Sequence, residues 1–259
     1  YELKEKFYNL GNKDRRILDY LEKTEAKDVL IKAFNTGRLN EDISERRMFS
    51  FINENLNPEK PELIKYFEEG REEDIALLFI DITSFSKTIS GWSNRNIKNY
   101  LDDYYKRIIP IIYKHKGEIE KLMGDGIICV FGKPFLEVNN PEYVYHAERC
   151  AEEVIKEFHS TDKNVKVAIH KGSVTYYKVP GEEYGEYTMI GQPITELYRL
   201  ESVSISNAIN FFTGSTYDKL GWEKSIFSVN NLFFKELEIP DLQGVDFEKI
   251  KTLKFPNYL

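Results

Sequence analysis

The chain has 259 residues, of which 41% are apolar and 31% are charged, and its formal net charge is −7. This length and apolar content are enough for a packed core in one large or two small domains. The negative charge gives no electrostatic reason to bind nucleic acid or an anionic membrane surface, so we expect neither as a partner.

Apolar runs and cysteines bear on where the protein works. The longest apolar runs are only about five to seven residues, well short of a membrane span, and no signal-like segment opens the chain. The two cysteines, Cys129 and Cys150, are too few for a disulfide framework, and no CxxC motif supports a zinc site. We therefore expect a cytoplasmic protein, with Cys129 buried as a small thiol in the run IICVF.

The first part of the chain reads as helical. Apolar residues of the segment from Ile17 to Phe34 recur at helical spacing among many charges. Pro58 and Pro61 interrupt any helix and mark a boundary before the next unit. We expect a helical N-terminal extension over residues 1–70 and a second domain over residues 71–259.

From residue 71 onward, strand patterns alternate with helix patterns. The run Ile75 to Ile82 is almost wholly apolar, which is typical of a central strand covered on both faces. Ser93 is expected to cap a helix that Pro110 bends near its end. The apolar positions expected on one face of that helix are Ile97, Leu101, Tyr104, Ile108 and Ile112.

The remaining elements follow from turn signals and periodicity. EIEKLM and IICVF flank Gly124-Asp125-Gly126 with the spacing of a β-hairpin. A helix is expected over Pro141 to His159, and a second hairpin is expected at Lys171-Gly172, between VKVAIH and SVTYY. YTMI, AINFF and IFSVN read as strands and PITELYRLES as a helix. The fold class is therefore α+β.

Two aspartates stand out among these elements. Asp81 closes one expected strand and Asp125 lies in a tight turn between two others, so both can lie at one edge of the same sheet. Two carboxylates about 4 Å apart repel by roughly 4 kcal/mol at an effective dielectric of 20, so such a pair needs a cation. Magnesium is the obvious candidate, because it is usually held by few oxygen ligands together with waters and substrate phosphates. The segment Ile82 to Ser86 then leads into a turn whose free backbone amides could receive a triphosphate.

Simpler interpretations of both aspartates remain open at this point. A lone aspartate after a strand is most often a turn or helix-cap residue, and Asp-Gly in a hairpin is most often only a turn. Spacing alone does not decide between a turn and a metal site.

Three longer segments carry a resemblance to a known family. LLFIDITSFSKT (Leu77 to Thr88), GEIEKLMGDGIICVFG (Gly117 to Gly132) and YTMIGQPITELYRLES (Tyr187 to Ser202) closely resemble the catalytic core of class III nucleotidyl cyclases. The resemblance implies a ferredoxin-like domain, with a mostly antiparallel sheet flanked by helices. It also implies a head-to-tail homodimer with two active sites, each built from both protomers.

The resemblance also implies roles for individual residues. Asp81, Asp125 and Ile82 of one protomer would hold two Mg²⁺ or Mn²⁺ ions, and a nucleoside triphosphate would be converted to a 3′,5′-cyclic nucleotide. The substrate contacts would include Ser84, Phe85 and Ser86, with Phe85 lining the base pocket. The opposite protomer would contribute Lys121 and Thr188 to read the base, and Arg199 and Thr195 to catalysis.

Some of these positions have ordinary alternatives. Lys121 in an alternating strand could simply face solvent, and Thr188 is a common strand former. Arg199 could pair with Glu196 or Glu201 on the surface of its helix.

Three positions depart from the family pattern. Ser84 replaces a glycine found in many members, and Thr195 replaces an asparagine that orients the ribose and the transition state. Losing one such donor typically costs on the order of 10² to 10³ in rate. Gln243 stands where a lysine meets the triphosphate, which Lys235 or Lys249 could compensate.

These departures bear on the nucleotide. Lysine with threonine at the base-reading positions is compatible with ATP. A solitary cyclase domain with a helical extension and altered ribose and triphosphate contacts nevertheless resembles the pyrimidine cyclases of bacterial Pycsar antiphage systems. Those make cyclic UMP or cyclic CMP as a signal to a separate effector protein, and this interpretation is favoured over an adenylate cyclase.

Three further interpretations are weighed against it. Guanylate cyclase activity is disfavoured because Lys121 stands where a carboxylate would better receive the guanine hydrogens. A catalytically silent nucleotide-binding module stays open, although a silent domain has no need of a repelling aspartate pair. A diguanylate-type cyclase is disfavoured because the chain has no Gly-Gly-Asp/Glu-Glu-Phe turn.

Overall fold

The computed structural model describes residues 66–180, 187–220 and 233–254. Residues Gly70–Tyr176 and Thr188–Leu259 form one compact unit, which holds the site and is described here. The expected helical extension over residues 1–70 stays a prediction, since residues 1–65 lie outside the described residues. The expected strand IFSVN also lies outside them. None of the helices in the described ranges has the length and apolar character to cross a bilayer.

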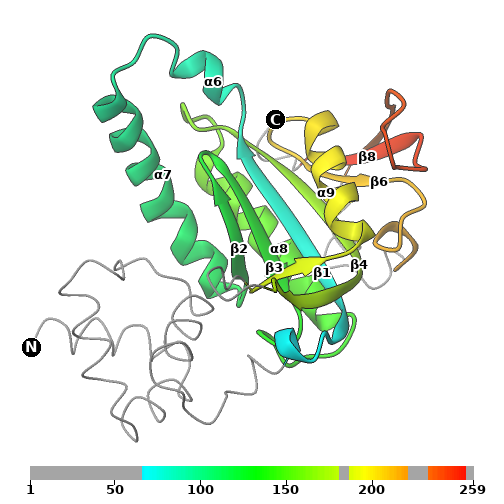
Figure 1. Ribbon diagram of the computed structural model, residues 1–259. Coiled ribbons are helices and arrows are strands. Elements are labelled where there is room, and N and C mark those ends of the chain that lie inside the picture. The colour runs from blue at the N-terminus through cyan, green and yellow to red at the C-terminus, as the bar shows by residue number, and fades with distance from the viewer. Residues whose placement is uncertain (1–65, 181–186, 221–232, 255–259) are drawn as a thin grey trace, which may run out of the picture. The chain divides into compact units, whose positions relative to one another are not determined.

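A mixed sheet forms the centre of this unit (Figure 1). Seven strands follow one another in the order β2 (Glu118–Met123), β3 (Gly126–Phe131), β1 (Glu72–Ile82), β4 (Val165–Lys178), β6 (Ile209–Phe212), β8 (Lys249–Lys254) and β7 (Phe233–Glu238), and β5 (Tyr187–Ile190) also pairs with β4. The β4–β6 pair is parallel, whereas β1–β3, β1–β4, β2–β3, β6–β8 and β7–β8 are antiparallel. The chain order β1-α7-β2-β3-α8-β4 with the spatial order β2-β3-β1-β4 is the expected ferredoxin-like arrangement.

Strand β1 is apolar because both of its faces are covered. Ala76, Leu78 and Ile80 belong to the core that contains the buried residues of α7 (Asn94–Lys114) and α8 (Glu142–Phe158). Side chains alternate along a strand, so Phe79 points to the other face, where its ring meets Tyr198 of α9 (Gln192–Val203) at a centroid distance of 5.4 Å. Figure 1 shows α9 and α8 on opposite sides of the sheet. The alternation therefore places Asp81 on the α9 face.

Helix α7 begins and packs largely as the sequence predicts. The Ser93 side chain accepts a hydrogen bond from the amide of Asn96 at 3.3 Å, which caps the helix, and Pro110 lies inside it. Tyr104 and Ile112 are fully buried. Ile97 and Leu101 are only half-buried, so the apolar face at the start of the helix is open to solvent.

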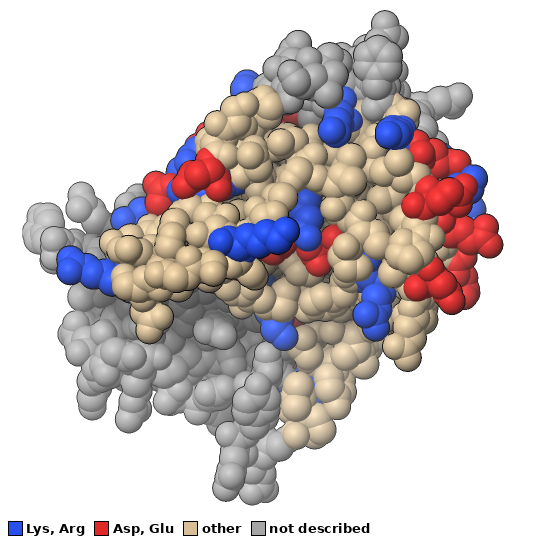
Figure 2. Space-filling model, turned by 90° about the horizontal axis from the view of Figure 1, so that it is seen from above, with Lys and Arg blue, Asp and Glu red and all other residues tan. Residues whose placement is uncertain are grey.

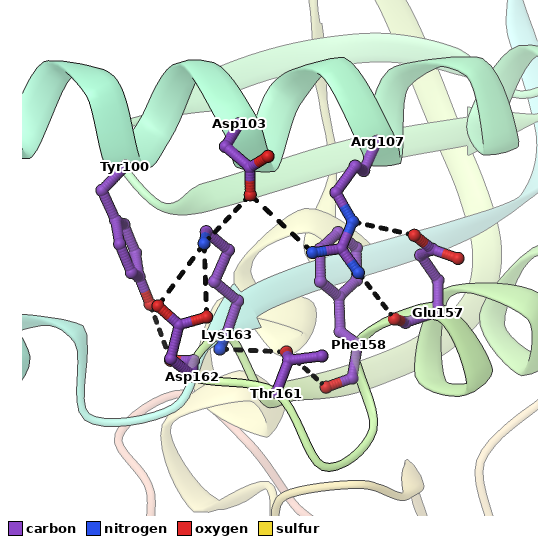
Figure 3. Close-up of polar contacts among 8 residues, drawn as sticks. All are labelled: Tyr100, Asp103, Arg107, Glu157, Phe158, Thr161, Asp162 and Lys163. Atoms are coloured by element: carbon purple, nitrogen blue, oxygen red, sulfur yellow. Dashed lines mark hydrogen bonds and ion pairs between the residues drawn. The ribbon is translucent and has the colours of Figure 1, made fainter.

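A polar network joins α7 to the end of α8 and the loop before β4 (Figure 3). Asp103 lies between two cations, with Lys163 Nζ at 3.0 Å and Arg107 Nη1 at 3.7 Å. Arg107 also donates to the side chain of Glu157 at 2.8 Å and to its backbone carbonyl at 2.9 Å. The Lys163 ammonium lies 4.2 Å from the centroid of the Tyr100 ring. These contacts fix the register of α7 against the loop that leads into β4.

The predicted hairpin at Lys171-Gly172 is wrong, because β4 runs without a break through both residues. Gly172 has a different purpose. A Cβ atom at this position would lie 2.4 Å from Cγ of Pro193, in the first turn of α9. The glycine therefore lets the start of α9 lie directly on the sheet. The close approach of α9 to β4, rather than a turn, therefore explains why glycine occupies position 172.

Candidate active site

Asp81 and Asp125 meet at one edge of the sheet, as the sequence predicts. Asp81 is the penultimate residue of β1, and Asp125 lies in the turn between β2 and β3, where Gly124 has a φ of 65°. The antiparallel pairing of β1 with β3 places Ile80 opposite Ile127, which brings the turn beside the end of β1. A Cβ atom at Gly126, the residue after Asp125, would lie 3.6 Å from Asp81 Oδ1, and each carboxyl group shifts the pKa of the other.

Burial and proximity shift the pKa values of this pair. Burial is the largest cause that raises the pKa of Asp81 to about 6, and the neighbouring Asp125 raises it further. Burial also raises the pKa of Asp125, but the hydrogen bond with Asp81 acts to lower it. Both carboxyl groups therefore hold a proton more readily than a free aspartate does. Two ionised carboxylates at this edge are costly without a cation.

A lysine and a glutamate complete the cluster. Lys166 lies directly opposite Asp81 in the β1–β4 register, and its Nζ is 3.3 Å from Asp81 Oδ2 and 2.5 Å from Glu201 Oε1, in the last turn of α9. Burial acts to lower the pKa of Lys166, but its contacts with Glu201 and Asp81 outweigh burial and raise it. Burial raises the pKa of Glu201.

The donor set fits a hard divalent cation held partly by other ligands. Asp81 and Asp125 offer carboxylate oxygens, whereas the side chain of Ile82 is buried, so Ile82 could contribute only its backbone. The described residues contain no group of three or more His, Cys, Asp and Glu side chains arranged as a metal cluster. Two carboxylates, with waters and substrate phosphates supplying the other ligands, are typical of magnesium sites.

The segment after Asp81 forms the short helix α6 (Phe85–Thr88). Ser84 lies at its N-cap position in the left-handed conformation, with φ 59° and ψ 26°, which glycine adopts at lower cost, and its side chain makes no capping hydrogen bond. The serine thus keeps the backbone shape that a glycine would have at this position. Phe85 packs against Tyr100 at a centroid distance of 6.0 Å and is half-buried, whereas Ser86 is exposed.

The two expected base-reading residues lie close together on β2 and β5. Thr188 Oγ1 donates a hydrogen bond to Glu120 Oε1 at 3.1 Å, and Glu120 precedes Lys121 in the chain. A β-bulge between Ile119 and Lys121 makes Glu120 the extra residue of β2. Lys121 is exposed and makes no ion pair with another described residue. Because its hydroxyl proton is directed to Glu120, Thr188 presents an acceptor to any further partner.

Helix α9 presents Thr195 and Arg199 one turn apart, and both are exposed. Surface pairing of Arg199 is not seen. Glu196 instead binds His170 Nε2 at 2.7 Å, and Glu201 binds Lys166. Arg199 has no ion pair with any residue in the described ranges, so its guanidinium is available to an anion.

The expected triphosphate region is less complete. Gln243 is exposed beside Gly244, whose carbonyl accepts a hydrogen bond from Gln192 at 2.8 Å. Lys249 is held by Glu238 at 2.9 Å and Glu236 at 3.4 Å, so it does not supply a free cation there. Lys235 is exposed.

Sequence reasoning missed three residues of this region: Glu120, Lys166 and Glu201. The sequence could not indicate Lys166 and Glu201 as neighbours of Asp81, because the β1–β4 register and the position of α9 on the sheet bring them to it. Glu120 acquires its contact through a bulge, which the alternating pattern of EIEKLM does not reveal.

Charged side chains of both signs lie on the described surface. On the face shown in Figure 2, Lys and Arg side chains lie dispersed over the described surface, the largest acidic group lies at the right margin, and a smaller one lies at the upper left. The expectation that nucleic acid is not a partner stays a prediction.

A family profile described as the adenylate and guanylate cyclase catalytic domain matches residues 67–244. The match spans most of the chain and includes every candidate site residue except the alternative lysine Lys249. The chain belongs to this family. Its membership confirms the fold class and the class III cyclase resemblance that the sequence motifs carry.

Individual curated relatives are similar over about half of this chain. The chain is 28% identical over 133 residues to an uncharacterized protein of Mycobacterium tuberculosis, covering 51% of this chain and 23% of that one. It is 25% identical over 142 residues to Adenylate cyclase 1 of Rhizobium meliloti, covering 51% and 21%. The chain thus spans less than a quarter of the length of these curated relatives.

A solved structure shows the same fold. The guanylate cyclase domain of RhGC from Catenaria anguillulae, solved in complex with GTP, has a TM-score of 0.58 and 20% sequence identity. The superposed part covers 71% of this chain and 98% of that domain. The cyclase-family domain described here therefore has the fold of a nucleotide-bound relative.

Proposed function

We propose that the protein is a class III nucleotidyl cyclase, which converts a nucleoside triphosphate into a 3′,5′-cyclic nucleotide and pyrophosphate. The observation that carries this proposal is the meeting of Asp81 and Asp125 at one sheet edge in a chain of the cyclase family. In the reaction the ribose 3′-oxygen bonds to the α-phosphorus as the bond to the pyrophosphate oxygen breaks.

Asp81, Asp125 and the backbone of Ile82 would hold two divalent ions, Mg²⁺ or Mn²⁺. Such ions, when bound, lower the pKa of the 3′-hydroxyl and neutralise phosphate charge. The chain's part is to hold the two carboxylates together and half-buried, where electrostatic interactions are stronger than in water. Ser84, Phe85 and Ser86 follow directly and would contact the polyphosphate and base.

The active unit would be a homodimer in which each site uses both protomers. Lys121 and Thr188 of the partner would read the base, and Arg199 and Thr195 of the partner would act on the phosphate and ribose. Arg199 is exposed and forms no ion pair with another residue in the described part of the chain, which supports this role, because such a guanidinium is available for phosphate. The helical extension over residues 1–70 is proposed as a domain separate from the cyclase domain.

We propose UTP or CTP as the substrate, with cyclic UMP or cyclic CMP acting as an antiphage alarm signal to a separate effector in the cytoplasm. The resemblance to pyrimidine cyclases supports this choice, together with Thr195 and Gln243 at the altered ribose and triphosphate positions. Both cysteines are free and buried, as a reducing compartment allows.

Adenylate cyclase is the second candidate, and one contact favours it. Thr188 presents an acceptor because it donates to Glu120, and Lys121 is a donor, so the pair can meet the amino group and ring nitrogen of adenine. Glu120 also places a carboxylate beside Lys121, which weakens the sequence argument against guanine.

One assay separates these candidates. The full chain is incubated with Mn²⁺ and each of the four ribonucleoside triphosphates, and products are resolved by mass. A cyclic pyrimidine nucleotide as the main product supports the proposal, and cyclic AMP supports the second candidate. If the chain binds nucleotide but no cyclic product forms from any substrate, the silent nucleotide-binding module is correct.

A further inference from the structure

The carboxylate pair already has a cation of its own. Lys166 reaches Asp81 from the neighbouring strand, and the cross-strand register, not a flexible loop, places it there. Its ammonium lies 3.3 Å from Asp81 Oδ2. Both side chains are largely buried, at 22% and 20% exposed, so solvent screens this contact only partly.

The same ammonium has a second and closer acceptor. Glu201 Oε1 lies 2.5 Å from Lys166 Nζ, and Glu201 is only 17% exposed. Lys166 can therefore leave Asp81 without losing its shortest ion pair. A lysine that contacts two carboxylates in this way can keep its contact with one when another cation takes the other.

We propose that Lys166 is the resident counter-ion of the Asp81–Asp125 pair, which a divalent cation displaces, and that Glu201 holds the displaced ammonium. The proposal rests on the proposed function, because it takes these aspartates as metal ligands. Lys166 and Glu201 are positioning residues here, since neither is assigned a contact with substrate.

The proposal gives the two residues opposite effects on metal affinity. A metal ion must replace the ammonium at Asp81 and then lie near its positive charge, so Lys166 weakens metal binding. Glu201 draws the ammonium away from Asp81 and partly neutralises it, so Glu201 strengthens metal binding. A purely structural role for this ion pair would instead make both substitutions act in the same direction.

The chain offers a matched control on the same two strands. Lys171 of β4 forms an ion pair with Asp74 of β1 toward the opposite end of the strand pair, and its side chain is buried. Lys171→Met therefore removes a buried cross-strand lysine without touching the Asp81 cluster.

The test measures Mn²⁺ binding to the full chain without nucleotide, by electron paramagnetic resonance of free Mn²⁺ at pH 8.5. Lys166→Met is expected to lower the Kd about tenfold, and Glu201→Gln to raise it about tenfold, within the range typical of residues around metal ligands. Lys171→Met is expected to leave it unchanged. The Mn²⁺-induced rise in Tm should follow the same order.

Weaker Mn²⁺ binding in both Lys166→Met and Glu201→Gln would overturn the proposal. If Lys166→Met fails to fold by circular dichroism, Glu201→Gln decides alone, and unchanged or tighter binding in that variant overturns the proposal. The Asp125→Asn variant distinguishes a failure of the proposed metal site from a failure of the proposed role of Lys166 and Glu201. If wild type binds no Mn²⁺, or Asp125→Asn binds it equally well, the metal assignment of the proposed function fails and takes this inference with it. If Asp125→Asn abolishes binding but the two substitutions do not act oppositely, only this inference fails.

Discussion

The carboxyl group of Asp81, the penultimate residue of strand β1, lies beside that of Asp125 in the turn of the β2–β3 hairpin, and each shifts the pKa of the other. Burial on the α9 face and this contact favour the protonated form of Asp81. An acidic pair that is costly when ionised is stable in a protein only with a compensating cation or a proton.

The first prediction concerns stability against pH in the presence of EDTA. The pKa of Asp81 is 3.8 in a model peptide and about 6 in the folded chain, so the folded state binds more protons than the unfolded state between these values. The free energy of unfolding contributed by Asp81 therefore falls as pH rises through this window, by on the order of 2 kcal/mol. Urea denaturation at pH 4.5 and pH 7.5 should show a smaller loss for Asp81→Asn than for wild type. Equal losses would show that Asp81 does not titrate as the structure indicates.

The second prediction concerns the contact between β4 and α9. Gly172→Ala places a methyl group against Pro193 and should lower the free energy of unfolding by about 1 to 3 kcal/mol, because the start of α9 must move. Activity should fall more than stability alone explains, since α9 carries Thr195 and Arg199. Ser173→Ala, at the exposed neighbouring position, is the control and should be neutral in thermal denaturation. A neutral Gly172→Ala would contradict the close packing.

The third prediction concerns base reading. Lys121→Ala and Thr188→Val should each change the ratio of kcat/KM between the preferred and other nucleotides by about tenfold or more, because they remove the donor and the acceptor that we propose read the base. Lys121 is exposed, so its substitution should leave Tm unchanged. Steady-state kinetics with the four triphosphates measures these ratios. A uniform loss across all nucleotides would assign both residues to folding or assembly instead.

The fourth prediction concerns the face of α9 that Thr195 and Arg199 share. Arg199→Ala should lower kcat by about 10² to 10³ if the guanidinium stabilises charge in the transition state. Thr195→Asn should raise kcat, because it restores the amide that the family pattern has at this position. Both residues are exposed, so circular dichroism and Tm should not change. Unchanged turnover in Arg199→Ala would remove it from the mechanism.

Sequence analysis predicted those helices, strands and turns whose sequence signals lie within the segment itself. The apolar run of β1, the Ser93 cap of α7 and the Gly124-Asp125 turn all appear where the sequence places them. Because the turn joins β2 to β3 and β3 pairs with β1, Asp125 lies near Asp81. Local patterns allowed this meeting, and the family resemblance favoured it.

Features that depend on contacts between residues far apart in the chain could not be predicted from local sequence patterns. Gly172 looked like a turn residue because the sequence does not show Pro193 lying on it. The ion pair between Lys166 and Glu201 depends on where α9 packs on the sheet, and no local sequence pattern predicts that position. The Glu120–Thr188 contact depends on a bulge that a period-two pattern cannot reveal.

The measurement that tests the central claim most directly compares wild type with Asp125→Ala, each incubated with Mn²⁺ and the preferred triphosphate, with products resolved by mass. Asp125→Ala should remain folded, because the residue lies in a hairpin turn and its removal relieves repulsion with Asp81. The account predicts cyclic nucleotide and pyrophosphate from wild type and no cyclic nucleotide from the variant. Full turnover by Asp125→Ala would contradict it.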